Sequence, residues 1–203
     1  TDDWHIDILV SGSQKALMLP PGLAFASVSE KAWGLNKTAS LPRFYFDFAK
    51  ERKSLAKNTG AYTSAVTLII GLQQVLRQIK TLGLEAVFAR NKRLSEATKA
   101  GIKALGLKFY AEENPSESLT AIQAPEGING QDVVKIMREK YGVTIAGGQA
   151  QAKGKIFRIS HMGYVNEFDV IVALSALELA LKDLGYPVEL GAGVRAAEMV
   201  FGG

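Results

Sequence analysis

The 203-residue chain contains no cysteine, and this absence excludes several kinds of chemistry. A chain without thiols forms no disulfides, holds no metal through thiolates and has no cysteine nucleophile. Its only histidines are His5 and His161, which are too few for a histidine-rich metal centre. We therefore expect no bound metal.

Long apolar runs are also missing. The most apolar stretch, residues 65–72, is interrupted by Thr67 and Gly71 and is much shorter than the roughly 18 residues that a membrane-spanning helix needs. The amino end lacks the charged, apolar and small-residue succession of a secretory signal. The sequence predicts no membrane span and a cytoplasmic location.

Positive charge is in slight excess but is not concentrated. The formal net charge is +4, and the densest basic groups, residues 50–53 and 90–93, are short. Nucleic-acid binding usually requires a basic stripe interleaved with exposed aromatic residues. Because no such stripe is present, we interpret both groups as solvated helix faces and expect no nucleic-acid partner.

The most informative feature present is Lys15, which follows a short apolar strand expected over residues 6–10 and a small turn, Ser11 to Ser13. A lysine amine that is partly removed from water loses its proton more easily, and the neutral amine can form a Schiff base with an aldehyde. A solvated loop lysine is the simpler alternative. A serine-lysine hydrolase pair, Ser13 with Lys15, lacks any matching oxyanion site.

The segment 11–17, Ser-Gly-Ser-Gln-Lys-Ala-Leu, followed by Pro-Pro-Gly at 20–22, resembles the cofactor-lysine segment of the class V (fold-type I) pyridoxal-phosphate aminotransferases. Within that family it is similar to the alanine-glyoxylate (serine-pyruvate) aminotransferases. The similarity continues through nearly all of the chain and includes a second motif, residues 154–160. Two separated motifs in the same order are more specific than one.

The resemblance implies pyridoxal 5'-phosphate as the cofactor and gives four residues a role. Lys15 is expected to bind the cofactor as a Schiff base and then to transfer the substrate proton, while Gln14 contacts the phosphate. Thr63 is expected to reach the phosphate of the neighbouring subunit in a homodimer; a helix N-cap is the alternative for it. Gly60 stands where relatives have a phosphate-binding tyrosine, so the chain departs from the family pattern at this position. Arg158 is expected to hold the substrate α-carboxylate through two parallel hydrogen bonds.

The hydrophobic pattern predicts an α/β chain. The resemblance implies the end of the large-domain sheet of a fold-type I enzyme (residues 1–83), followed by a C-terminal α/β small domain (residues 84–203). Because the cofactor-binding residues that precede the lysine in the family are missing, we expect the chain to be the C-terminal half of a longer enzyme. The expected strands are 6–10, 22–28, 107–110, 119–124, 143–146 and 156–159, and the expected helices are 63–80, 84–105, 131–140 and 167–184.

The expected activity of the full-length enzyme is transfer of an amino group from alanine or serine to a small 2-oxo acid such as glyoxylate or pyruvate. Desulfurases of the same fold are excluded because they need a cysteine to carry sulfur. A non-catalytic subunit that keeps the aminotransferase scaffold, as in some soluble-hydrogenase subunits, is the alternative. Lys15 and Arg158 favour retained catalysis.

Overall fold

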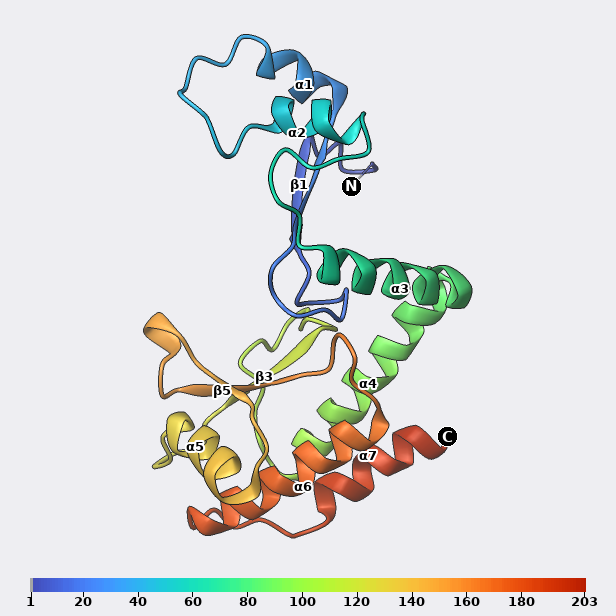
Figure 1. Ribbon diagram of the computed structural model, residues 1–203. Helices are drawn as coiled ribbons and strands as arrows, with labels where there is room; N and C mark the ends of the chain where they lie inside the picture. Colours follow the sequence, from blue (N-terminus) through green and yellow to red (C-terminus); the bar gives the residue numbers. More distant parts are fainter. Residues whose placement is uncertain (1) are drawn as a thin grey trace. The chain divides into compact units, whose positions relative to one another are not determined.

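The computed structural model describes residues 2–203, and the chain divides into two compact units, Thr1–Gln78 and Ile79–Gly203 (Figure 1). This division falls five residues before the boundary predicted at Gly83, within helix α3 (Val66–Leu82). The assignment of the two parts to a large and a small domain stays a prediction. Each unit is described by itself.

The first unit contains a β-hairpin and three helices. Strands β1 (Ile8–Gly12) and β2 (Ala24–Val28) pair antiparallel, with Ile8 opposite Val28. Both lie close to the predicted strands, β1 two residues later than expected. The connection between them contains Lys15. Helices α1 (Glu30–Asn36) and α2 (Phe48–Leu55) follow, before α3.

Side-chain caps define the short helices of this unit. Ser29 precedes α1, and its hydroxyl accepts a hydrogen bond from the Ala32 N–H. Asp47 caps α2 in the same way, by accepting from the Ala49 N–H. Such caps satisfy backbone donors that have no partner within the helix. The caps explain how two helices this short begin at defined residues.

The second unit is a three-stranded antiparallel sheet with helices packed on one face. The sheet order is β3-β5-β4, so β5 is central. Thr120 and Ile122 of β3 and Phe157 and Ile159 of β5 are buried on the face that joins the helical core. Figure 1 shows α6 and α7 below this sheet and α4 running down beside it, and the three helices pack against one another. The strands are β3 (Leu119–Gln123), β4 (Ala146–Gly147) and β5 (Ile156–Ser160), and the helices are α4 (Leu84–Ala104), α5 (Gly130–Tyr141), α6 (Glu167–Asp183) and α7 (Ala192–Gly202), with a 3₁₀ turn at Ala150–Ala152.

A close approach of helices fixes the core of the second unit. A Cβ atom added to Gly101 of α4 would lie 2.6 Å from a methyl carbon of Leu174 in α6 and 3.0 Å from the Gly193 carbonyl oxygen in α7. Only a residue without a side chain fits at this point. Gly101 therefore lets three helices meet, at the small helix-propensity cost of a glycine.

Two predictions about the second unit need correction, and one helix was missed. Residues 107–110 form no strand. Only a few backbone hydrogen bonds join this segment to β3, so it makes a single isolated bridge, between Phe109 and Ile122, and no continuous ladder. The strand expected at 143–146 is reduced to Ala146–Gly147. Helix α7 was not predicted. The other predicted helices and strands of this unit are confirmed within about two residues at each end.

Candidate functional site

Lys15 lies in the ordered connection between β1 and β2. Its carbonyl accepts a hydrogen bond from the Met18 N–H at 3.0 Å, and Met18 adopts a positive φ of 58° that turns the chain back toward β2. The side chain of Lys15 is exposed. The sheltered environment expected for its amine is therefore not supplied by the residues around it, because most of this turn faces solvent.

Ser13 is the residue that holds the turn together. It is fully buried, and its hydroxyl donates to the Pro20 carbonyl at 2.7 Å and accepts from the Leu23 N–H at 3.2 Å. Its backbone N–H also donates to the Leu23 carbonyl. Ser13 is thus a turn-forming hydroxyl, as the sequence predicts, and it fixes the backbone two residues before Lys15.

Gln14 and Thr63 are both exposed, as a contact to a cofactor phosphate would require. The Gln14 side chain folds back beside the strand end, since a Cβ on Gly12 would lie 2.8 Å from its Oε1. Thr63 precedes α3, which begins only at Val66. The alternative interpretation of Thr63 as the cap of this helix is therefore wrong, because the helix starts three residues later.

Arg158 occupies the middle of β5, on the sheet face opposite the helical core. Ala121 of β3 and Ala146 of β4 lie directly beside it in the register. The Nε–H of Arg158 donates to the Gly147 carbonyl at 3.1 Å. Within residues 2–203, neither of its two Nη atoms has a hydrogen-bond or ion-pair partner. The half-buried guanidinium is thus held at one edge while its two terminal nitrogens stay available.

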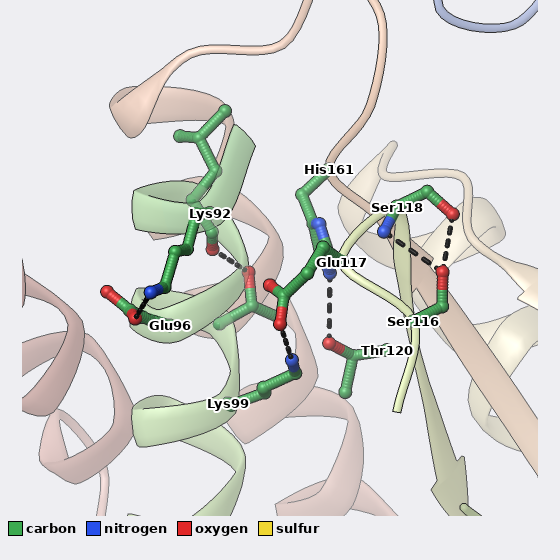
Figure 2. A network of polar contacts seen from close by, with 10 residues as sticks. Lys92, Glu96, Lys99, Ser116, Glu117, Ser118, Thr120 and His161 are labelled. Atoms are coloured by element: carbon green, nitrogen blue, oxygen red, sulfur yellow. Dashed lines mark hydrogen bonds and ion pairs between the residues drawn. The ribbon is translucent and has the colours of Figure 1, made fainter. Parts of the chain in front are cut away.

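A polar network lies near Arg158 in sequence but on the core side of the sheet (Figure 2). His161 follows β5, is fully buried and lies with Nε2 3.0 Å from the Thr120 hydroxyl. Lys99 of α4 donates to Glu117 at 3.1 Å. Burial, together with the positive charge of Lys99, lowers the pKa of His161 from 6.5 to about 4, although Glu117 acts in the opposite direction. His161 is a packed, neutral imidazole.

The buried imidazole predicts that the second unit loses stability in mild acid. In the unfolded chain His161 takes up a proton below pH 6.5, whereas in the folded chain it does so only near pH 4. Above pH 6.5 His161 is neutral in both states and does not change the free energy of unfolding. As the pH drops from 6.5 toward 4, the free energy of unfolding of the second unit therefore falls, by about 3 kcal/mol in total. Hydrogen exchange of second-unit peptides across this pH range measures the loss.

Two variants separate this effect from general acid denaturation. His161→Leu removes the titrating group, so the stability of that variant should change little between pH 6.5 and 4. His5→Gln removes the exposed histidine of the first unit and should leave the wild-type slope in place. An equally steep loss in His161→Leu would contradict the assignment.

Further features of the described residues concern a cavity, candidate metal ligands and membrane-spanning helices. A cavity of about 580 Å³ in the first unit is lined by α1 and α2 and includes none of the four predicted site residues. Residues 2–203 contain no group of three or more histidines, cysteines and carboxylates arranged to hold a metal ion. No helix in that range has the length and apolar character needed to span a bilayer.

Comparison with known proteins places the chain in a family. The family described as Aminotransferase class-V matches residues 1–173, and the chain belongs to it. The chain is 47% identical over 201 residues to the soluble hydrogenase small subunit of a Synechococcus strain, covering 98% of this chain and 52% of the relative. It is 41% identical to the L-aspartate–glyoxylate aminotransferase of Paracoccus denitrificans and 39% identical to the serine–glyoxylate aminotransferase of Arabidopsis thaliana, covering 97% of this chain and 50% of each relative.

The fold agrees with this assignment. The crystal structure of ureidoglycine–glyoxylate aminotransferase from Bacillus subtilis matches all of this chain with a TM-score of 0.93 at 29% identity, over 54% of its own length. The chain thus has the α/β fold of a fold-type I pyridoxal-phosphate enzyme, and its family implies that cofactor. It spans about half the length of the curated relatives it matches.

Proposed function

We propose that the full-length protein is a pyridoxal-phosphate-dependent transaminase that moves an amino group from alanine or serine to a small 2-oxo acid such as glyoxylate or pyruvate. The observation that carries this proposal is Lys15 on an ordered, accessible turn, within the family's cofactor-lysine segment. Glyoxylate in the names of several relatives supports it as the acceptor. The donor differs among those names, and alanine or serine is our choice from the resemblance.

The polar groups of the first unit suit this cofactor chemically. An exposed primary amine (Lys15), an amide (Gln14) and a hydroxyl (Thr63) are present, and such groups can hold an aldehyde and a phosphate. The bound cofactor supplies an electron sink for the substrate Cα. Lys15 would hold it through Nζ and then, as a neutral amine, remove the proton from that carbon. Gln14 would donate a hydrogen bond to a phosphate oxygen of this cofactor, and Thr63 to a phosphate oxygen of the neighbouring subunit's cofactor.

Arg158 would orient the substrate. A guanidinium binds a carboxylate through two parallel N–H···O bonds, which fixes the position of the α-carbon. The Nε contact to the Gly147 carbonyl leaves both Nη atoms of Arg158 for such a pair. We further propose a cytoplasmic homodimer, in which Thr63 serves the neighbouring subunit's phosphate as the resemblance implies.

Transamination by the full-length protein tests the proposal. With pyridoxal phosphate, L-alanine and glyoxylate, we expect pyruvate and glycine in equal amounts; L-serine should replace L-alanine as donor, with hydroxypyruvate as the product. Chromatography of the amino and 2-oxo acids measures both products. L-aspartate serves as the comparison donor. The absence of product with every donor would contradict the proposal.

A second candidate function is favoured by the name of one relative. That relative is called a soluble hydrogenase small subunit, so a scaffold role in an assembly is the alternative. A scaffold would not release pyruvate when the cofactor-loaded protein is mixed with L-alanine alone, whereas a transaminase completes this half-reaction once per cofactor. Single-turnover measurement of pyruvate distinguishes the two functions.

A further inference from the structure

Two small residues lie directly opposite Arg158 in the sheet, one on each neighbouring strand. Antiparallel pairing places Ala121 of β3 opposite Arg158 on one side and Ala146 of β4 opposite it on the other. Side chains of directly opposite residues share a sheet face, with Cβ atoms about 4.5–5.5 Å apart. The base of the Arg158 side chain is therefore flanked on both strands by methyl groups, and neither of them can pair with the guanidinium.

The sheet face that carries Arg158 is not the one that packs on the helices. Phe157 and Ile159, the neighbours of Arg158 along β5, are buried in the core. Because side chains alternate along a strand, Arg158 faces the other way. On that face Ala146 and Ser160 are exposed, Ala121 and Arg158 are half-buried, and Ile156 at the end of the strand is buried. A dissolved carboxylate can thus approach the guanidinium.

We propose that Ala121 and Ala146 keep Arg158 available to the substrate: because neither flanking side chain carries a negative charge, neither pairs with the guanidinium in place of the substrate carboxylate. This inference rests on the proposed role of Arg158 in substrate binding. The new element is the role of the two flanking positions. A longer acidic side chain at either position would form an ion pair with the guanidinium of Arg158, so that the arginine would no longer be free to bind the substrate.

Ala146 is the better position for a test. It is exposed and lies on the edge strand β4, so a larger side chain does not disturb the core. In Ala146→Glu the new carboxylate should pair with Arg158 and compete with the ligand. Ala146→Gln has the same shape without the charge. Thr144→Glu adds the same charge to an exposed position two residues outside the register.

The experiment uses the full-length protein and two measurements. Calorimetry gives the Kd for pyruvate without added cofactor, and steady-state kinetics gives KM and kcat for the amino donor. We expect Ala146→Glu to raise both Kd and KM about tenfold or more and to change kcat less than about threefold. Ala146→Gln and Thr144→Glu should raise Kd and KM less than about threefold. Arg158→Ala should weaken pyruvate binding at least as much as Ala146→Glu does.

The outcomes separate this inference from the proposed function. If pyruvate binding depends on Arg158 but is the same in Ala146→Glu and the wild type, or if Ala146→Gln weakens it as much as Ala146→Glu, this inference is overturned and the role of Arg158 stands. If Arg158→Ala leaves pyruvate binding unchanged, the role of Arg158 is overturned and the inference with it.

Discussion

Replacing Lys15 by alanine in the full-length protein should lower the rate of transamination by about 10⁴-fold or more. General acid–base catalysis by one positioned side chain contributes about 10²–10⁴-fold, and the proposed mechanism also needs this amine to hold the cofactor. The turn itself should survive the substitution, because it is held by Ser13 and by backbone hydrogen bonds. Single-turnover formation of pyruvate from L-alanine measures the loss.

Three comparisons show whether the loss is chemical. Lys15→Arg keeps the positive charge but has no nucleophilic amine, so it should be as inactive as Lys15→Ala. A small primary amine added to Lys15→Ala should restore part of the proton transfer. Lys80→Ala, at an exposed position on α3, should keep wild-type activity. Wild-type turnover in Lys15→Ala would remove Lys15 from the mechanism.

Replacing Glu178 by alanine should destabilise the second unit by at least about 3 kcal/mol. The buried carboxylate of Glu178 lies on α6 and accepts hydrogen bonds from three N–H groups at the start of α7: Gly191 at 2.5 Å, Gly193 at 2.8 Å and Val194 at 3.2 Å. The Gly193 donor is buried, and a buried donor left without a partner costs about 1–3 kcal/mol; the part-buried Gly191 and Val194 donors add smaller losses. A negative charge also stabilises the N-terminus of a helix.

The measurement must report on the second unit alone. Both tryptophans, Trp4 and Trp33, lie in the first unit, so their fluorescence does not follow it. Urea unfolding followed by hydrogen exchange of second-unit peptides reports on that unit. In Glu178→Ala, peptides of α7 should lose protection first. Glu198→Ala, an exposed change on the same helix, is the control. Equal unfolding midpoints for Glu178→Ala and wild type would contradict the prediction.

The same contact explains why α7 was not predicted from the sequence. A helix start is recognised from a capping side chain next to it, but here Gly191 precedes the helix and provides no side-chain cap. The cap comes from Glu178, which lies 13 residues earlier in the chain and is near the helix only after folding. A Cβ on Gly193 would lie 3.0 Å from the Glu178 carboxylate, so the glycine provides space rather than breaking the helix.

Elements with strong local signals were predicted well. Asn166 caps α6 through a reciprocal capping box with Asp169, and the predicted start of this helix at Glu167 is confirmed. The segment 107–110 has a strand-like composition, but it forms only a few bonds with β3 and makes no continuous ladder. Whether such a segment becomes a strand depends on its partners, which the local sequence does not specify.

The candidate site was only partly predictable for the same reason. Lys15 and Arg158 were found because they lie in recognisable motifs. The buried hydroxyl of Ser13, the Gly147 carbonyl beside Arg158 and the flanking Ala121 and Ala146 depend on strand pairing. A one-residue shift in register would replace both alanines as neighbours of Arg158. Such contacts emerge only from the structure.

The most direct test of the account is the site of cofactor attachment. Full-length protein incubated with pyridoxal phosphate is reduced with borohydride, digested and mapped by mass spectrometry. The account predicts that the modified lysine lies in the peptide that contains Ser13 and Lys15, and that this adduct is absent from Lys15→Ala. Stoichiometric attachment at another lysine, with Lys15 unmodified, would contradict it.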